Sequence, residues 1–190
     1  MSNYHLDFWS QPTELDVKVL EAQNAGRRFD VSRVQAIARR CAHNFPQVIV
    51  CKPFVVSEPF PTLFWLTCPY LGKKCGELES QQQIARLNDV LEKRASEVLA
   101  WHREYIAIRR TLIDPEQEKR LAEHSLSLLE AVFARGVGGI DFIKNPSSAK
   151  CLHLQTATWL GMGLHPAADW LEEKLSCLEC GNADCKKFLV

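Results

Sequence analysis

The segment SSAKCLHLQTATWLGMG (147–163) places a thiol and an imidazole at the start of an expected helix. Ser147 or Ser148 fits the helix start, so Cys151 falls in the first turn, where free amides and the helix dipole stabilise a thiolate. Cys151 is therefore a candidate metal ligand or nucleophile, with core packing as the alternative. His153 lies about 200° further around a continuous helix, so it shares a small ligand with Cys151 only if the helix begins after it. Otherwise His153 is a core or surface histidine with a satisfied hydrogen bond.

A second group of sulfur donors lies near the C-terminus. The segment CLECGNADC contains Cys177 and Cys180 in a C-x-x-C-G arrangement, followed by Cys185. Two cysteines at this spacing before a glycine can chelate one tetrahedral metal ion, and a fourth ligand could come from Cys75. An iron–sulfur cluster or a redox dithiol also fits the spacing. The remaining alternative is a solvent-exposed, thiol-rich tail.

A third group shares one face of an expected helix. His102, Tyr105 and Arg109 are spaced i, i+3 and i+7, so they could present an imidazole, a phenol and a guanidinium to one ligand. Arg109 could then bind an anion with two parallel hydrogen bonds. The spacing alone equally fits a solvated helix face.

Composition narrows the class of protein. The 190 residues are 46% hydrophobic, and 23 basic residues balance 23 acidic ones, so the chain has no overall basic field for nucleic acid or anionic lipid. The N-terminus lacks the pattern of a secretory signal, and no stretch is apolar enough to span a membrane. We expect a soluble cytoplasmic protein, in which the eight cysteines do not form a disulfide framework. We expect Cys51, within QVIVCKPFVV, to be a small buried hydrophobe.

Periodicity and turn residues predict the elements that position these groups. In the first half we expect a helix over 13–24 and a hairpin whose first strand, near 34–41, also fits a helical pattern. The proline-rich stretch 58–70 reads as extended, with Cys68 at a strand end.

The second half reads as helical. We expect a long helix over 77–112, and a second over 114–135 with Asp114 as its cap and Pro115 at its first position. A glycine-containing connector precedes the 147–163 helix, and a last short helix leads into the tail. The fold class is therefore α+β: a small β-layer in the N-terminal half packed with several helices. We expect one domain over 1–170, with 171–190 as a C-terminal cysteine-rich helix and tail.

Several separated segments resemble one bacterial family, Domain of Unknown Function 501. They occur in matching order and are RRCAHNFPQVIV (39–50), PFPTLFWLTCP (59–69), HREYIAIRR (102–110), GVGG (136–139) and KCLHLQTATWLGMGLHP (150–166). By this resemblance, Cys41, Cys68 and Cys151 belong to the family's motifs, whereas the C-terminal cysteines lie outside them. Asn44 stands where the family usually has a glycine, which would reshape the turn after Cys41. Ala149 replaces a basic residue that is common before the Lys-Cys pair.

Three motif cysteines, far apart in sequence and flanked by turn or helix-start residues, are typical of ligands that a fold gathers around one metal centre. Our first hypothesis is an enzyme in which Cys41, Cys68 and Cys151 hold a [4Fe–4S] cluster with one open iron. Lys150, His153 and Arg109 would serve as acid, base and anion-binding groups. A non-redox sulfur-removal, elimination or hydrolysis reaction on a small anionic metabolite would fit this arrangement.

Two further hypotheses use the same residues differently. In the second, the metal is zinc, His153 is the fourth ligand and the role is purely structural. In the third, the protein is a metal-free interaction module that exposes FWS (8–10) or its tail to a partner. A nucleophilic thiol at Cys151 is a separate alternative, which meets the same angular difficulty with His153.

Overall fold

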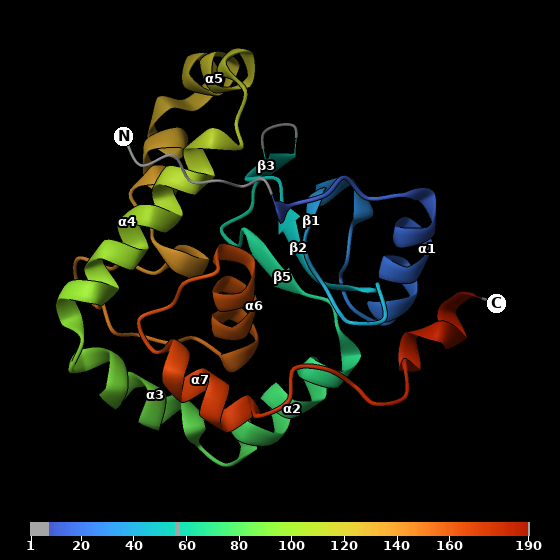
Figure 1. Ribbon diagram of the computed structural model, residues 1–190. Helices are drawn as coiled ribbons and strands as arrows, with labels where there is room; N and C mark the ends of the chain where they lie inside the picture. The colour runs from blue at the N-terminus through green and yellow to red at the C-terminus, as the bar shows by residue number, and fades with distance from the viewer. Residues whose placement is uncertain (1–7, 56–57, 190) are drawn as a thin grey trace.

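The computed structural model describes residues 8–55 and 58–189, and it has the α+β architecture that the sequence predicts (Figure 1). Its strands are β1 (Val34–Arg40), β2 (Pro46–Cys51), β3 (Phe54–Val55), β4 (Glu58–Pro59) and β5 (Phe64–Leu66). Its α-helices are α1 (Glu14–Gln23), α2 (Pro69–Ser80), α3 (Gln83–Glu92), α4 (Ala95–Thr111), α5 (Pro115–Phe133), α6 (Leu152–Met162) and α7 (Ala168–Leu175). Short 3₁₀ turns are η2 (Val31–Arg33), η3 (Val137–Gly139) and η4 (Asp184–Leu189).

A three-stranded antiparallel sheet, in the order β1-β2-β5, lies between α6 on one face and α1 on the other (Figure 1). The central strand β2 sends Val48 and Val50 into the core that contains α6, and Ile49 and Cys51 into the core that contains α1. Both faces are covered, which explains why β2 reads as an unbroken apolar run. Cys51 is 3% exposed, as expected for a small hydrophobe, and burial raises the pKa of its thiol to about 12.

The hairpin prediction is confirmed, and the alternative helix over 34–41 is wrong. β1 and β2 pair antiparallel, and the connecting turn closes where Cys41 N donates to Phe45 O at 2.9 Å. Asn44 has φ +64° in this turn. Asparagine tolerates the left-handed conformation better than most non-glycine residues. The change from glycine therefore leaves a turn that still uses a glycine-like backbone conformation.

Helix starts agree with the sequence better than helix lengths do. Thr13 and Asp16 form a capping box for α1, and Asp114 caps α5 by accepting from Gln117 N at 2.8 Å. The single helix expected over 77–112 is wrong, because this stretch belongs to α2, α3 and α4. α2 already begins at Pro69, which is tolerated at a first helical position. Gln82, with φ +60°, turns the chain between α2 and α3 without a glycine or proline to signal it.

Helix α6 lies at the centre of the molecule, enclosed by the sheet and by α2, α3, α4 and α7 (Figure 1). Most of its side chains are buried, and Gly161 lies against the ring of Phe64 on β5. Leu171 and Leu175 of α7 belong to the same core, so the first part of the expected C-terminal segment packs with the main body. No helix in the described part of the chain has the length and apolarity to cross a membrane.

The contact between Gly161 and Phe64 gives a test of this packing. A Cβ atom at Gly161 would lie 2.2 Å from Phe64 Cδ1, so Gly161→Ala should lower the free energy of unfolding by about 2 kcal/mol or more. Gly76, in α2, has no atom within 4 Å of the equivalent position, so Gly76→Ala should be neutral or stabilise by up to about 1 kcal/mol. Urea denaturation of both variants measures the difference, and equal stabilities would contradict the packing of α6 on β5.

A partly buried ion pair joins α1 to the hairpin. Arg40 Nη1 and Nη2 donate to the two carboxylate oxygens of Asp16 at 2.6 and 2.8 Å. These hydrogen bonds outweigh the desolvation of the carboxylate and lower the pKa of Asp16 to about 2. A folded-state pKa below the unfolded value means that the pair stabilises the protein above about pH 4 and ceases to do so as the pH falls towards 2.

Asp16→Asn should therefore lower the free energy of unfolding by about 2 kcal/mol at pH 7, and the loss should shrink between pH 4 and pH 2. Denaturant titrations of the wild type and the variant at pH 7, 4 and 3 measure this difference. A loss that stays the same at every pH would assign the stabilisation to packing rather than to charge.

Candidate functional site

Cys151 stands immediately before α6 rather than inside it. It is the N-cap residue, with an extended backbone (φ −162°, ψ 156°), and its Sγ accepts from Leu154 N at 3.4 Å. The helix begins at Leu152, so the alternative start after His153 is wrong. The angular argument against a shared ligand of Cys151 and His153 is also wrong, because it assumed that both residues lie within one helix.

Glu79, near the end of α2, completes the start of α6. Its Oε1 accepts from Leu152 N at 2.6 Å, and His153 Nδ1 lies 3.0 Å from the same oxygen. Helix-start amides lack partners within the helix, and a carboxylate satisfies them while complementing the positive end of the helix dipole. Glu79 therefore fixes the position of α6 and the orientation of the His153 ring together.

Glu79, Cys151 and His153 each offer one ligand atom, and these atoms lie within 4.8 Å of one another. All three residues are partly buried, and in residues 8–55 and 58–189 no other group of three such residues is this close. Burial raises the pKa of the Cys151 thiol, against the opposing hydrogen bond from the Leu154 amide. A bound cation would favour the thiolate, as coordinated thiols lose their proton.

The site opens into a cavity of about 750 Å³. Cys151 and His153 line it, and three basic residues surround it: Arg27, Arg28 and Lys150. Its remaining walls are mainly apolar and come from Pro61, Thr62, Phe64, Trp65, Leu66, Gly138 and Leu154. This combination of positive charge and apolar surface suits a small anion that also carries an apolar part.

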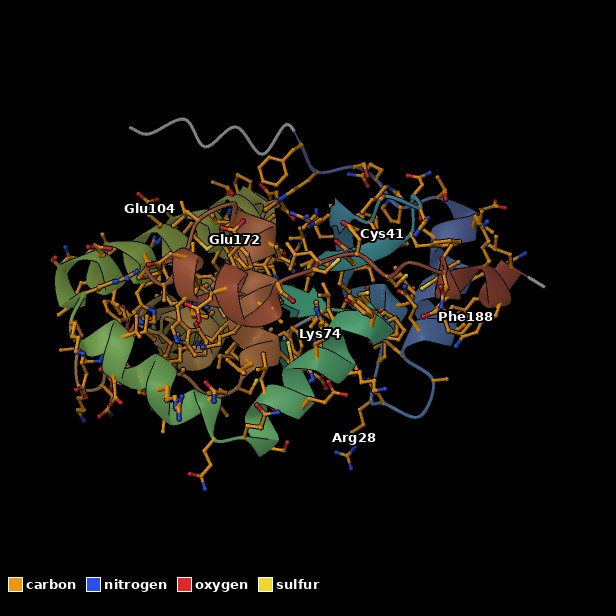
Figure 2. The ribbon with its side chains drawn as sticks, turned by 60° about the horizontal axis from the view of Figure 1, so that its bottom comes forward. Arg28, Cys41, Lys74, Glu104, Glu172 and Phe188 are labelled. Carbon is orange, nitrogen blue, oxygen red and sulfur yellow. The ribbon has the colours of Figure 1, made fainter. Side chains whose placement is uncertain are left out.

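The three basic residues come from two segments far apart in sequence. Arg27 and Arg28 follow α1, and Arg28 extends outward from that loop (Figure 2). Arg27 Nη1 lies 3.4 Å from Leu66 O, a weak contact. Lys150 Nζ donates to Gly138 O at 2.7 Å, which holds the Lys150 amine beside the cavity. Each of these side chains has more N–H donors than these contacts use, so donors remain for a ligand.

Arg109 is placed differently from either sequence interpretation. It is fully buried, and both terminal nitrogens donate to backbone carbonyls. These four bonds of 2.6–3.1 Å reach Pro61, Val132, Arg135 and Gly136. A guanidinium with these bonds holds the segments around α4 together. It has no pair of parallel N–H donors left to bind an anion. The solvated helix face is wrong, and the contacts give no support to the role of Arg109 in binding a substrate.

The other two members of that face are also structural. Tyr105 is buried, and its hydroxyl accepts from Leu63 N and donates to Pro61 O. His102 Nδ1 accepts from Val137 N at 3.1 Å, which leaves Nε2 as the donor to Pro146 O. Burial lowers the pKa of His102, so its ring is neutral near pH 7.

The structure separates the three family cysteines into two places. Cys151 lies with Glu79 and His153, whereas Cys41 packs with Phe45 and Cys185 of the C-terminal tail. Cys68 is the N-cap of α2, and its backbone amide bonds to Gln47 O. The side chain of Gln47 in turn donates to Leu178 O, also in the tail. Cys41 and Cys68 are thus neighbours of the tail.

Two cysteines of the expected C-terminal metal site, Cys75 and Cys177, have surroundings that give no support to metal binding there. Cys75, the expected fourth ligand, is buried in the main core with its Sγ 3.4 Å from Thr156 Oγ1, and burial raises its pKa to about 11. Cys177 is exposed, and its thiol donates to Glu179 O at 3.1 Å.

Sequence reasoning missed Glu79, Arg27, Arg28 and Trp65. One signal for Glu79 was present: the first turn of α6 contains no acidic residue, so its amides had to find an acceptor elsewhere. Nothing in the sequence indicated which distant carboxylate would supply it.

Comparison with known proteins adds a family but no activity. No curated protein and no solved structure matches the chain. A family model described as a protein of unknown function, DUF501, matches residues 37–173. The matched region contains Glu79, Lys150, Cys151 and His153, and it ends before the C-terminal cysteines. The chain belongs to the DUF501 family.

Proposed function

We propose that this protein is a metal-dependent enzyme that performs hydrolysis or elimination on a small anionic molecule. The observation that carries the proposal is the convergence of Glu79, Cys151 and His153 within 4.8 Å at the wall of a basic cavity. The reaction class and the anionic substrate are those that we expected from the sequence, but the ligand set is different.

Zinc fits these donors best. Zinc binds cysteine, histidine and carboxylate ligands, and its catalytic sites combine three protein ligands with one position open to water or substrate. Cys151 and His153 line the cavity, so an open position at this set would face the ligand space. Zinc would supply a Lewis acid and acidify a water molecule at neutral pH.

The basic residues supply the substrate-binding part of the proposal. Lys150 directly precedes the ligand Cys151. Arg27 and Arg28 are more distant in the sequence, but they line the same cavity. Their combined charge attracts an anion, and the Trp65 and Phe64 side chains offer contact to its apolar part. In this arrangement Lys150 binds substrate, and His153 acts as a ligand instead of a proton-transfer group.

The expected cluster on Cys41, Cys68 and Cys151 receives no support from these contacts. Cys151 has Glu79 and His153 as neighbours, and the other two cysteines adjoin the tail. A single ion at Glu79, Cys151 and His153 preserves the open coordination position that the three-cysteine cluster was expected to provide.

A second candidate is a thiol nucleophile without metal. The 3.0 Å contact between Glu79 Oε1 and His153 Nδ1 favours it, because a carboxylate that orients a histidine is the usual support of a general base. Cys151 would then attack substrate, with amides at the start of α6 near the sulfur.

Metal content distinguishes the two candidates. Purified protein should hold about one zinc per chain, and Cys151→Ser and His153→Ala should each lower that by at least about tenfold. Cys177→Ser is the matched control, since Cys177 is exposed and outside the site, and it should retain zinc. Zinc should also protect Cys151 from alkylation by iodoacetamide. Equal zinc content in all four proteins, or rapid alkylation with no bound zinc, would favour the nucleophile instead.

Inorganic phosphate tests the anion site. Calorimetric titration should show that Arg27→Gln weakens phosphate binding by about tenfold, equivalent to about 1.4 kcal/mol. Arg103→Gln is the control, because Arg103 is exposed on α4 and absent from the cavity wall. Removal of zinc by a chelator should weaken phosphate binding further. Identical affinities for the wild type and Arg27→Gln would contradict the assignment of the cavity.

A further inference from the structure

The C-terminal tail brings a second set of cysteines together. After α7 the chain returns towards the N-terminal part, passes the start of α2 and ends beside α1 (Figure 1). Lys74 on α2 holds the beginning of this path by donating to the carbonyl oxygens of Leu175 and Cys177. The tail thereby reaches Cys41 and Cys68, which come from two other segments.

Hydrogen bonds fix the tail against the hairpin turn. Ala42 N donates to Glu179 Oε2 at 2.9 Å, and His43 Nε2 lies 2.8 Å from Cys180 O. The His43 contact therefore places the backbone of Cys180 beside the turn that follows Cys41. The backbone oxygen of Gln47 accepts from Cys68 N, and its side-chain amide donates to Leu178 O. Gln47 therefore links the start of α2 to the tail.

The sulfur atoms of Cys41 and Cys185 have defined surroundings. Both residues belong to one small apolar cluster with Val19 and Phe45, and Phe188 packs against it; Figure 2 shows the segment of Phe188 beside the hairpin that carries Cys41. Gln23 Nε2 donates to Cys185 Sγ at 3.3 Å, and Phe45 N donates to Cys41 Sγ at 3.4 Å. Burial raises the pKa of the Cys185 thiol against the hydrogen bond from Gln23, and hydrogen bonds to sulfur tune metal centres.

Cys68 and Cys180 lie in the same region. Cys68 is the N-cap residue of α2 without a hydrogen bond to its side chain, and it belongs to the apolar core cluster against which Leu178 of the tail packs. Burial is the main cause of the raised pKa of both Cys68 and Cys185; smaller contributions come from Cys185 and Cys180 at Cys68, and from Cys41 and Cys180 at Cys185. Each of the four thiols therefore lies within electrostatic reach of at least one of the others, and Cys185 links them all.

The spacing of these sulfurs selects the kind of metal centre. A single tetrahedral zinc with bonds of about 2.3 Å would hold its sulfurs about 3.8 Å apart. No three of the four thiols form a group within 4.8 Å, since the Glu79 group alone meets that condition in the described residues. A cluster of several irons and sulfides is larger than one ion and holds its thiolates farther apart.

We propose that Cys41, Cys68, Cys180 and Cys185 bind one iron–sulfur cluster that fastens the C-terminal tail to the hairpin. Four thiolates fill the protein ligand positions of such a cluster, so it has no open iron for substrate and its role is structural. This centre is independent of the zinc site, and it uses two of the three cysteines that the sequence assigned to a cluster. Cys177, exposed and directed to Glu179 O, is not a ligand.

The test is the iron and acid-labile sulfide content of protein purified without oxygen. The wild type should hold about four of each per chain and absorb near about 400 nm. Cys180→Ser and Cys185→Ser should each lose most of this iron, and Cys41→Ser should do the same. Cys177→Ser and Cys151→Ser are controls that should keep it. Without the cluster, Cys180→Ser and Cys185→Ser should also be cleaved faster by trypsin at Lys186 and Lys187. The helical circular dichroism signal should stay unchanged.

Three results would overturn the proposal. The wild type could contain no iron, or it could contain zinc at these cysteines without sulfide. The third is loss of iron in Cys151→Ser with retention in Cys180→Ser and Cys185→Ser, which would restore the three-cysteine set that the sequence suggested. Because the tail variants change residues beyond the main core, their helical content separates loss of the cluster from failure to fold.

Discussion

A helix that starts inside a protein must find acceptors for its first amides, and α6 is such a helix. Its N-terminus lies among α2, the connector after α5 and the cavity, and its first amides need acceptors that the helix itself does not supply. Glu79 and Cys151 provide the acceptors. The same requirement that fixes the central helix therefore gathers a carboxylate, a thiol and an imidazole at one point. The chemistry of the site follows from the way in which the core is closed.

The connector before α6 is built around the same requirement for close packing. Gly136 leaves room for the His102 ring, and Gly138, at φ +59°, lies against Leu154. Arg109 then donates to the carbonyl oxygens of Arg135 and Gly136 at the beginning of this connector. A buried cation surrounded by carbonyl oxygens stabilises loops that have few backbone bonds of their own. Arg109 of α4 also donates to Pro61 O, so α4 supports one of the residues that line the cavity.

Local patterns predicted the parts of this fold that depend on neighbours in sequence. The cap at Asp114, the helix expected over 13–24 and the hairpin between β1 and β2 follow from such patterns. The breaks between α2, α3 and α4 do not, because Gln82 and Arg94 are ordinary helix residues and tertiary packing decides where the chain turns. Cys151 was recognised as a site residue, but its partner Glu79 lies on a helix 72 residues earlier, and only the fold brings the two together. Arg109 shows the opposite error: its helical spacing suggested a surface position, but the side chain is buried. Its carbonyl partners lie in the last turn of α5 and in loops, and no sequence pattern indicated them.

The path of the tail affects how the protein is made. Val19 on α1 and Phe45 in the hairpin turn are covered by Cys185 and Phe188, and the bond from Gln23 to Cys185 spans 162 residues. While the chain is being translated, the first helix and the hairpin can form, but their outer apolar surface stays uncovered until Cys185 and Phe188 have been made. A product that stops before Cys185 would expose this surface, which a protease can then recognise.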